Sequence, residues 1–175
     1  MRLFLVAALV VGMSATAGVA QREDGGCSFG KLAPRPAPEI LGSPDLVART
    51  QVLLQPDSPV AILRVDVSRV RLFTAPGSYE ATGVYSLDVQ NISRVPLTDV
   101  NVWVSVWLGA AAGAAGKKLG RPLRPGEVAH IEWKGGTGRG SDVTQLEAEL
   151  IAFVDTVKTG TCTFKPSQAW PVRPS

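Results

Sequence analysis

The chain has 175 residues, of which 45% are hydrophobic and 19% charged, with 18 Lys and Arg against 15 Asp and Glu. About 155 residues remain once an N-terminal signal is set aside, enough for one domain that buries ~70% of its unfolded surface. The charges are interspersed, and the cluster Arg64, Arg69 and Arg71 is typical of solvated strand positions. A nucleic-acid surface needs a concentrated basic patch, so we expect no nucleic-acid partner.

Residues 1–20 have the order of a secretory signal. Arg2 supplies a short positive region, Leu3–Val11 an apolar core, and small residues lead up to Ala20. This order predicts cleavage after Ala20 and a mature protein in the periplasm or outside the cell. A membrane anchor needs ~20 continuous apolar residues, and this run is about half as long before Ser14 interrupts it. We therefore expect no stable membrane anchor.

The only two cysteines, Cys27 and Cys162, stand near the two ends of the mature chain. In an oxidising compartment this pattern predicts one disulfide bond. A metal site would need three or four ligands, and the single histidine, His130, has no companion at ligand spacing. Charged residues separate Cys27 from the apolar segment, which is not typical of a lipid-modified cysteine. We expect no metal and no other cofactor.

Residues 21–58 are predicted to form an irregular lead-in, followed by a β-sandwich domain at 59–165 and a tail at 166–175. Proline alternates with other residues over 33–38, which favours extended chain. Leu46–Leu54 fits an edge strand, and a short helix that begins at Ser43 with Pro44 in its first turn is the competing interpretation.

Beyond residue 60 the apolar residues alternate as in half-buried strands. Leu63, Val65 and Val67 share one face, and a phase shift at Val70 predicts a β-bulge. After a turn at 74–78, strands are predicted at 84–92 and 97–108. The strand at 97–108 is apolar on both faces, which is typical of a central strand.

The glycine-rich segment 109–118 (GAAAGAAGKK) is predicted to be a flexible loop. We expect 119–123 to pair with 128–134 across the turn Arg124–Glu127, with Ala129, Ile131 and Trp133 facing inward and His130 outward. Residues 135–140 read as another loop. Val143–Val157 fits both strand and helix spacing, and the surrounding strands favour a strand.

Residues 84–133 carry a family resemblance. The segments Val89-Gln90-Asn91-Ile92-Ser93, 99–106 and Leu123-Arg124-Pro125-Gly126-Glu127 follow one another as two strands and a turn. This third of the chain resembles the immunoglobulin-like and fibronectin-III-like domains of bacterial extracytoplasmic proteins. The resemblance implies an all-β, antiparallel sandwich with a binding, spacer or assembly role. It brings no functional residues with it.

The sequence contains no recognisable catalytic constellation. Nucleophilic hydrolysis needs a nucleophile, a base and an orienting group, and His130 is the only imidazole, with no Gly-x-Ser-x-Gly elbow in the chain. The glycines after Lys134 lack the spacing of a phosphate-binding loop. Glu147 and Glu149 alternate with apolar residues, as on a solvated strand face. Asn91-Ile92-Ser93 matches a glycosylation sequon. We nominate no catalytic residue.

Trp103 and Trp107 share one strand face about 13 Å apart. Exposed, they could stack on sugar rings or anchor a protein; we expect them to be buried, because strand tryptophans in sandwiches usually pack inward. The favoured function is a non-enzymatic binding or structural module whose partner is a protein or a cell-surface polymer. A carbohydrate-binding module that uses both tryptophans and a small hydrolase are the alternatives.

Overall fold

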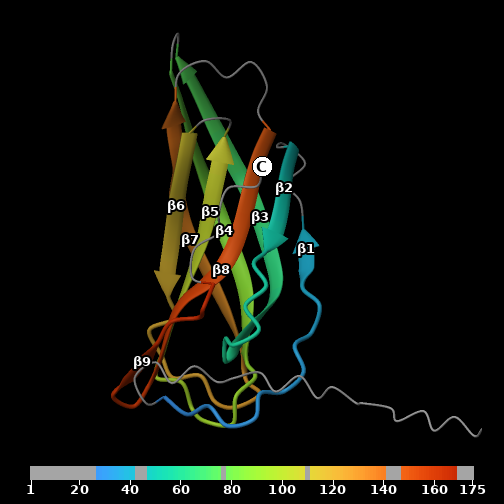
Figure 1. Cartoon of the computed structure of the whole chain (residues 1–175). Helices are drawn as coiled ribbons and strands as arrows, with labels where there is room; N and C mark the ends of the chain where they lie inside the picture. Colours follow the sequence, from blue (N-terminus) through green and yellow to red (C-terminus); the bar gives the residue numbers. More distant parts are fainter. Residues whose placement is uncertain (1–26, 42–46, 76–77, 109–110, 141–146, 169–175) are drawn as a thin grey trace, which may run out of the picture.

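The computed structural model describes residues 27–41, 47–75, 78–108, 111–140 and 147–168, and within these ranges every regular element is a strand. The strands form two sheets that face each other (Figure 1). The predicted all-β, two-sheet class is therefore confirmed. The predicted signal at 1–20 lies outside the described residues. In the described part of the chain, no helix is long and apolar enough to cross a membrane.

Each sheet has four strands in its main order, and a short ninth strand joins the second. Sheet A runs β1 (Glu39–Leu41), β3 (Val60–Ala75), β4 (Ser78–Asn91) and β7 (Val128–Gly140). Sheet B runs β2 (Val47–Val52), β8 (Glu147–Thr159), β5 (Asp99–Leu108) and β6 (Ala111–Lys118), and β9 (Cys162–Phe164) pairs with β8.

Both sheets are mixed, which corrects the expectation of a purely antiparallel sandwich. β1 runs parallel to β3, and β2 runs parallel to β8. Both of these strands come from the lead-in, so the chain switches sheets between β1 and β2. Parallel neighbours need a long connection, and alternation of apolar residues carries no information on the direction of a partner that is distant in sequence.

The core lies between the sheets and follows the predicted alternation. Tyr85, Leu87 and Val89 of β4 face the valines of β5, and all are fully or almost fully buried. The predicted bulge in β3 is confirmed by a register shift between Ser68 and Arg71, and a second shift lies between Ile62 and Arg64. At ~25 cal/mol per Å² of apolar surface, this shared interior is the main stabilising term.

Two ambiguous segments are strands. The lead-in segment 47–52 forms β2 at the edge of sheet B, so the edge-strand interpretation is confirmed and the helix interpretation fails over these residues. Residues 147–157 belong to β8, as favoured. Residues 43–46 and 143–146 lie outside the described ranges. β5 lies between β8 and β6, and its prediction as a central strand is confirmed.

The prediction of a flexible loop at 109–118 is wrong for 111–118, which form β6. Every residue of β6 pairs with a residue of β5. A Cβ atom built on Gly116 would lie 2.5 Å from Cδ2 and Cε2 of Trp103. Glycine is therefore required here because an aromatic ring packs directly against the strand backbone, not because the chain is a linker.

The prediction of a loop at 135–140 is also wrong, since β7 continues to Gly140 and pairs with the start of β4. β6 and β7 lie on the same side of the sandwich, at the left in Figure 1. A Cβ atom on Gly135 would lie 2.6 Å from the Cβ of Ala115 in β6. Small residues let these two sheet edges approach each other.

The expected pairing of 119–123 with 128–134 does not form. Leu123 makes an isolated bridge with Leu97, and β7 pairs with β4 instead. The assignment of faces within β7 is nevertheless confirmed: Ala129, Ile131 and Trp133 are buried, and His130 is exposed. Alternation fixes the face of a side chain but not the identity of the neighbouring strand.

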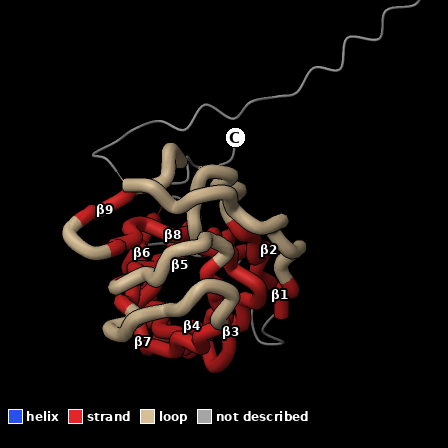
Figure 2. The backbone as a smooth tube through the Cα atoms, turned by 90° about the horizontal axis from the view of Figure 1, so that it is seen from below, coloured by secondary structure: helices blue, strands red, loops and turns tan. Residues whose placement is uncertain are grey.

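Loops gather at one end of the sandwich, which is seen from below in Figure 2. Cys27 and Cys162 form the predicted disulfide there, with their Cα atoms 5.6 Å apart and 135 residues between them in sequence. Arg35 attaches the lead-in to the same end by donating hydrogen bonds to the carbonyls of Gln55, Ser58 and Val60. Burial lowers the pKa of Arg35, and the Asp57 carboxylate opposes this shift.

Candidate functional site

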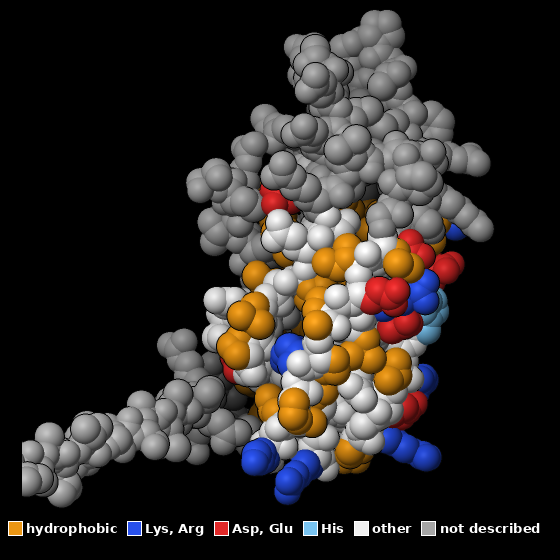
Figure 3. All heavy atoms as spheres, turned by 90° about the vertical axis from the view of Figure 1, so that its right-hand side faces the viewer, with side chains coloured by type: hydrophobic (Ala, Val, Ile, Leu, Met, Phe, Trp, Pro, Cys, Tyr) orange, Lys and Arg blue, Asp and Glu red, His pale blue; other side chains and the backbone are white. Residues whose placement is uncertain are grey.

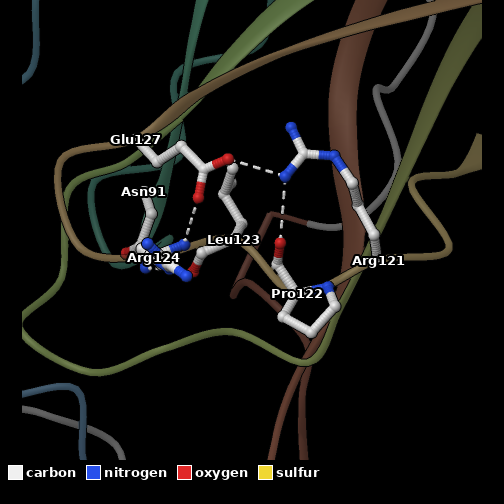
Figure 4. Close-up of polar contacts among 6 residues, drawn as sticks. All are labelled: Asn91, Arg121, Pro122, Leu123, Arg124 and Glu127. Carbon is white, nitrogen blue, oxygen red and sulfur yellow. Dashed lines mark hydrogen bonds and ion pairs between the residues drawn. The ribbon is translucent and has the colours of Figure 1, made fainter.

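The two motifs behind the family resemblance meet at the loop end (Figure 4). Asn91 Nδ2 donates to the carbonyls of Val95 and Leu123 at 2.9 and 3.0 Å. Its backbone N–H donates to the Glu127 carbonyl, and its own carbonyl accepts from the Gly126 N–H. One buried side chain therefore joins the end of β4 to the turn before β7.

The turn itself is closed by Glu127. Gly126 has φ +77°, which favours glycine, and the Glu127 N–H donates to the Arg124 carbonyl. The Glu127 carboxylate accepts from the Arg124 N–H at 2.8 Å and from the Arg121 guanidinium at 2.6 Å. These interactions, the backbone hydrogen bond first, lower the pKa of Glu127. The polar groups of this turn hold the turn, which indicates a structural role.

The sequon at Asn91 is incompatible with glycosylation of the folded protein. The Asn91 side chain is fully buried, and its Oδ1 accepts from both the N–H and the hydroxyl of Ser93. A glycan on Nδ2 would break both of its hydrogen bonds and has no space beside the core. Asn91 is a buried fixing point, and no modification site is assigned to it.

The outward face of sheet A carries a hydrogen-bonded row of polar side chains. His130 Nδ1 lies 2.7 Å from Asp88 Oδ1, and His130 Nε2 lies 3.3 Å from Ser86 Oγ. On the same face, Arg64 and Asp66 lie 3.9 Å apart. Charged side chains and the histidine gather along the right-hand side of Figure 3.

The order Ser86–His130–Asp88 matches the connectivity of a hydrolytic triad. Its setting differs: the His130 side chain is 58% exposed on an open sheet. Ser86 lies on β4, which pairs on both sides with β3 and β7, so the ladders use its backbone N–H. Acyl transfer needs free donors for the oxyanion, and the sheet leaves none beside Ser86. The row is better explained as cross-strand pairing of polar residues.

Sequence reasoning missed this row because it depends on register. Asp88 lies opposite His130 only in the observed β4–β7 pairing, and the sequence alone placed His130 beside Glu132 in its own strand. Polar residues at alternate positions of both strands were the available signal, but they indicate only that both rows face solvent.

The expectation of buried tryptophans is wrong for both Trp103 and Trp107. Each lies on the outward face of sheet B, away from the inter-sheet core, and is half-buried. Trp103 pairs with Phe153 on one side and with Gly116 on the other, and its ring lies against the backbone of Gly116. Part of each indole is therefore covered by its own sheet and part is presented to solvent.

Small side chains border these tryptophans. Ala114 and Gly116 of β6 lie on the same face as Trp103 and Trp107 and are exposed. We call these four residues the aromatic platform. It is flat and apolar, because β6 has no side chain larger than a methyl group between 111 and 116.

No group of three or more His, Cys, Asp or Glu suited to a metal ion occurs among the described residues. Comparisons of the chain with protein-family models, with curated proteins and with solved structures found no match. The functional interpretation therefore rests on the surfaces themselves.

Proposed function

We propose that this chain is an exported, non-enzymatic binding module of the immunoglobulin-like class, and that a protein partner contacts the aromatic platform. The observation that carries the proposal is the half-buried state of Trp103 and Trp107 on an outward sheet face. Tryptophans that are fixed by packing and still partly exposed supply large contact area at low entropic cost.

The shape and chemistry of the platform favour a protein partner. Binding hot spots are apolar, well packed and surrounded by residues that exclude water. The flat β6 surface beside the indoles lets another sheet or an extended segment approach closely. The charged residues of sheet A lie on the opposite side of the sandwich, so they do not oppose an apolar contact.

The immunoglobulin-like assignment is supported by two facing sheets and by the Asn91–Leu123 link between motifs that the resemblance identified. The parallel strands β1 and β2 are additions to an antiparallel pattern. Export is supported by the signal-like segment and by the Cys27–Cys162 pair, which requires an oxidising compartment to persist.

Site-directed photocrosslinking tests the proposal. A photoreactive phenylalanine analogue replaces Ala114 on the platform, and in a matched variant it replaces Glu132 on sheet A. We expect discrete protein adducts in the extracytoplasmic fraction from position 114 only, and their loss in Trp107→Ala but not in Asp88→Ala. Equal adducts from both positions, or adducts that persist in Trp107→Ala, would refute the platform.

Sugar binding is a second candidate, because two indoles four residues apart on one strand face also suit stacking against a polymer of sugar rings. Depletion of the protein by insoluble cell-wall polysaccharide measures this. Binding that Trp107→Ala reduces tenfold or more, without protein adducts at position 114, would favour the sugar over the protein.

A further inference from the structure

The described chain ends beside the edge of β8. After β9, Pro166 is buried, and the Ser167 N–H donates to Asp57 Oδ2 at 2.7 Å. The Gln168 carbonyl then accepts a hydrogen bond from Gln55 Nε2. The last described residues are therefore fixed to the segment that follows β2.

Gln55 holds this end of the chain against β8. Its side-chain amide accepts from the Val154 N–H and donates to the Val154 carbonyl, both at 2.8 Å. The amide thus occupies the edge of β8 just beyond the point where β2 stops pairing, at Val52 and Ala152. Gln168 lies next to Val154 at the same level.

The sheet leaves one direction for the residues that follow Gln168. Continuing along the edge of β8 is blocked, because β2 pairs with β8 from 147 to 152. The space between the sheets is filled by Leu150, Ala152 and Val154. The remaining open course leads over the outward face of sheet B.

That outward face holds two side chains that need a cover. Ile151 is 5% exposed and Phe153 is 0% exposed, although neither belongs to the inter-sheet core. Both alternate with the inward-facing residues of β8, and they lie opposite Ser105 and Trp103 of β5. Large apolar side chains on a solvent-side face are not buried this deeply by their own flat sheet.

We propose that residues 169–175 (AWPVRPS) form a strap across the outward face of sheet B, with Trp170 packed on Ile151 and Phe153. Trp170 is two residues beyond Gln168, a reach of about 7 Å. Pro171 lacks an N–H and favours extended chain, which suits a segment that crosses a sheet without joining its ladder. The strap borders the aromatic platform but does not depend on the function proposed for it.

Nuclear Overhauser spectroscopy of the mature full-length protein tests the strap directly. We expect cross-peaks between the Trp170 indole protons and the Phe153 ring and Ile151 methyl protons. Sharp Trp170 signals at random-coil positions, without such cross-peaks, would overturn the proposal. A mixture of labelled and unlabelled protein distinguishes a second copy as the cover: cross-peaks between copies that fade on dilution would also overturn it.

Truncation provides an independent measurement. Deletion of 169–175 should expose Phe153, increase the fluorescence of an added anilinonaphthalene sulfonate dye several-fold, and lower Tm by about 4–8 °C. Trp170→Ala should reproduce most of this effect. Deletion of Pro174 and Ser175 alone is the matched control and should change neither quantity. Unchanged dye binding and Tm in Trp170→Ala would contradict the strap.

Discussion

The outward faces of the two sheets differ in what they leave to solvent. On sheet A the outward residues Ser86, Asp88 and His130 are polar and pair with one another across strands. On sheet B the corresponding positions of β8 hold Ile151 and Phe153, which are buried. The comparison shows that sheet A has one dry face and sheet B has two.

This difference has energetic consequences. A polar row on an open sheet exchanges hydrogen bonds to water for hydrogen bonds within the protein, with a small net gain. A buried aromatic side chain contributes both transfer free energy and packing. Substitutions on the outward face of sheet B should therefore cost far more than substitutions at matched positions of sheet A.

The largest effect is expected at Phe153. Phe153→Ala should lower the free energy of unfolding by about 3–5 kcal/mol, because it removes a fully buried ring and leaves a cavity. Urea denaturation followed by circular dichroism measures the loss. Glu132→Ala, at an exposed position of sheet A, is the control and should change it by less than about 0.5 kcal/mol. Equal losses in the two variants would abolish the distinction between the faces.

A smaller loss is expected at the contact between β6 and Trp103. Gly116→Val should cost about 1–3 kcal/mol, because the new side chain displaces the indole from the strand backbone. The tryptophan emission should shift to longer wavelength. Ala114→Val, two residues away on the same face but exposed, should leave both stability and emission unchanged. A Gly116→Val protein with wild-type emission would show that Trp103 does not need this contact.

The polar row of sheet A should tolerate substitution. Asp88→Ala should lower the free energy of unfolding by no more than about 1 kcal/mol, as expected for an exposed pair. Turnover of p-nitrophenyl acetate tests the triad-like order of the row. We expect Ser86→Ala to hydrolyse this ester at the same rate as the wild type and as Ser105→Ala. Ester hydrolysis lost only in Ser86→Ala would instead establish a catalytic site on this face.

The smallest effect belongs to the turn below both faces. The pKa of Glu127 is lowered in the folded protein from its ordinary value of 4.5, so its carboxylate stabilises the fold above that value. This stabilisation is lost as the pH falls through the lower, folded pKa. The stability difference between wild type and Glu127→Gln should therefore shrink between about pH 5 and pH 3. A difference that grows on acidification would contradict the assigned direction.

The strands that alternate cleanly could be predicted from the sequence. In β4, β5 and β7 the inward residues were identified correctly, because burial of one face imposes a period of two. The pairing of Cys27 with Cys162 also followed from counting. Both predictions depend on properties of single segments or single residues.

The candidate sites could not be predicted in the same way. β6 was assigned to a loop because glycine and alanine have low strand preference, whereas its place in the sheet depends on the Trp103 ring and on the approach of β7. The contact of His130 with Asp88 depends on register between strands about 40 residues apart. The half-buried state of Trp103 and Trp107 depends on which face of β5 meets the other sheet.

The disulfide at the loop end changes how the molecule responds to tension. Cys27 and Cys162 enclose both sheets within one covalent loop that spans 135 residues of sequence. A force that pulls the two chain ends apart passes through the sulfur–sulfur bond and leaves the strands between the cysteines unloaded. The sandwich can therefore be held under load between two attachments without unfolding, and reduction of a single bond would make it extensible.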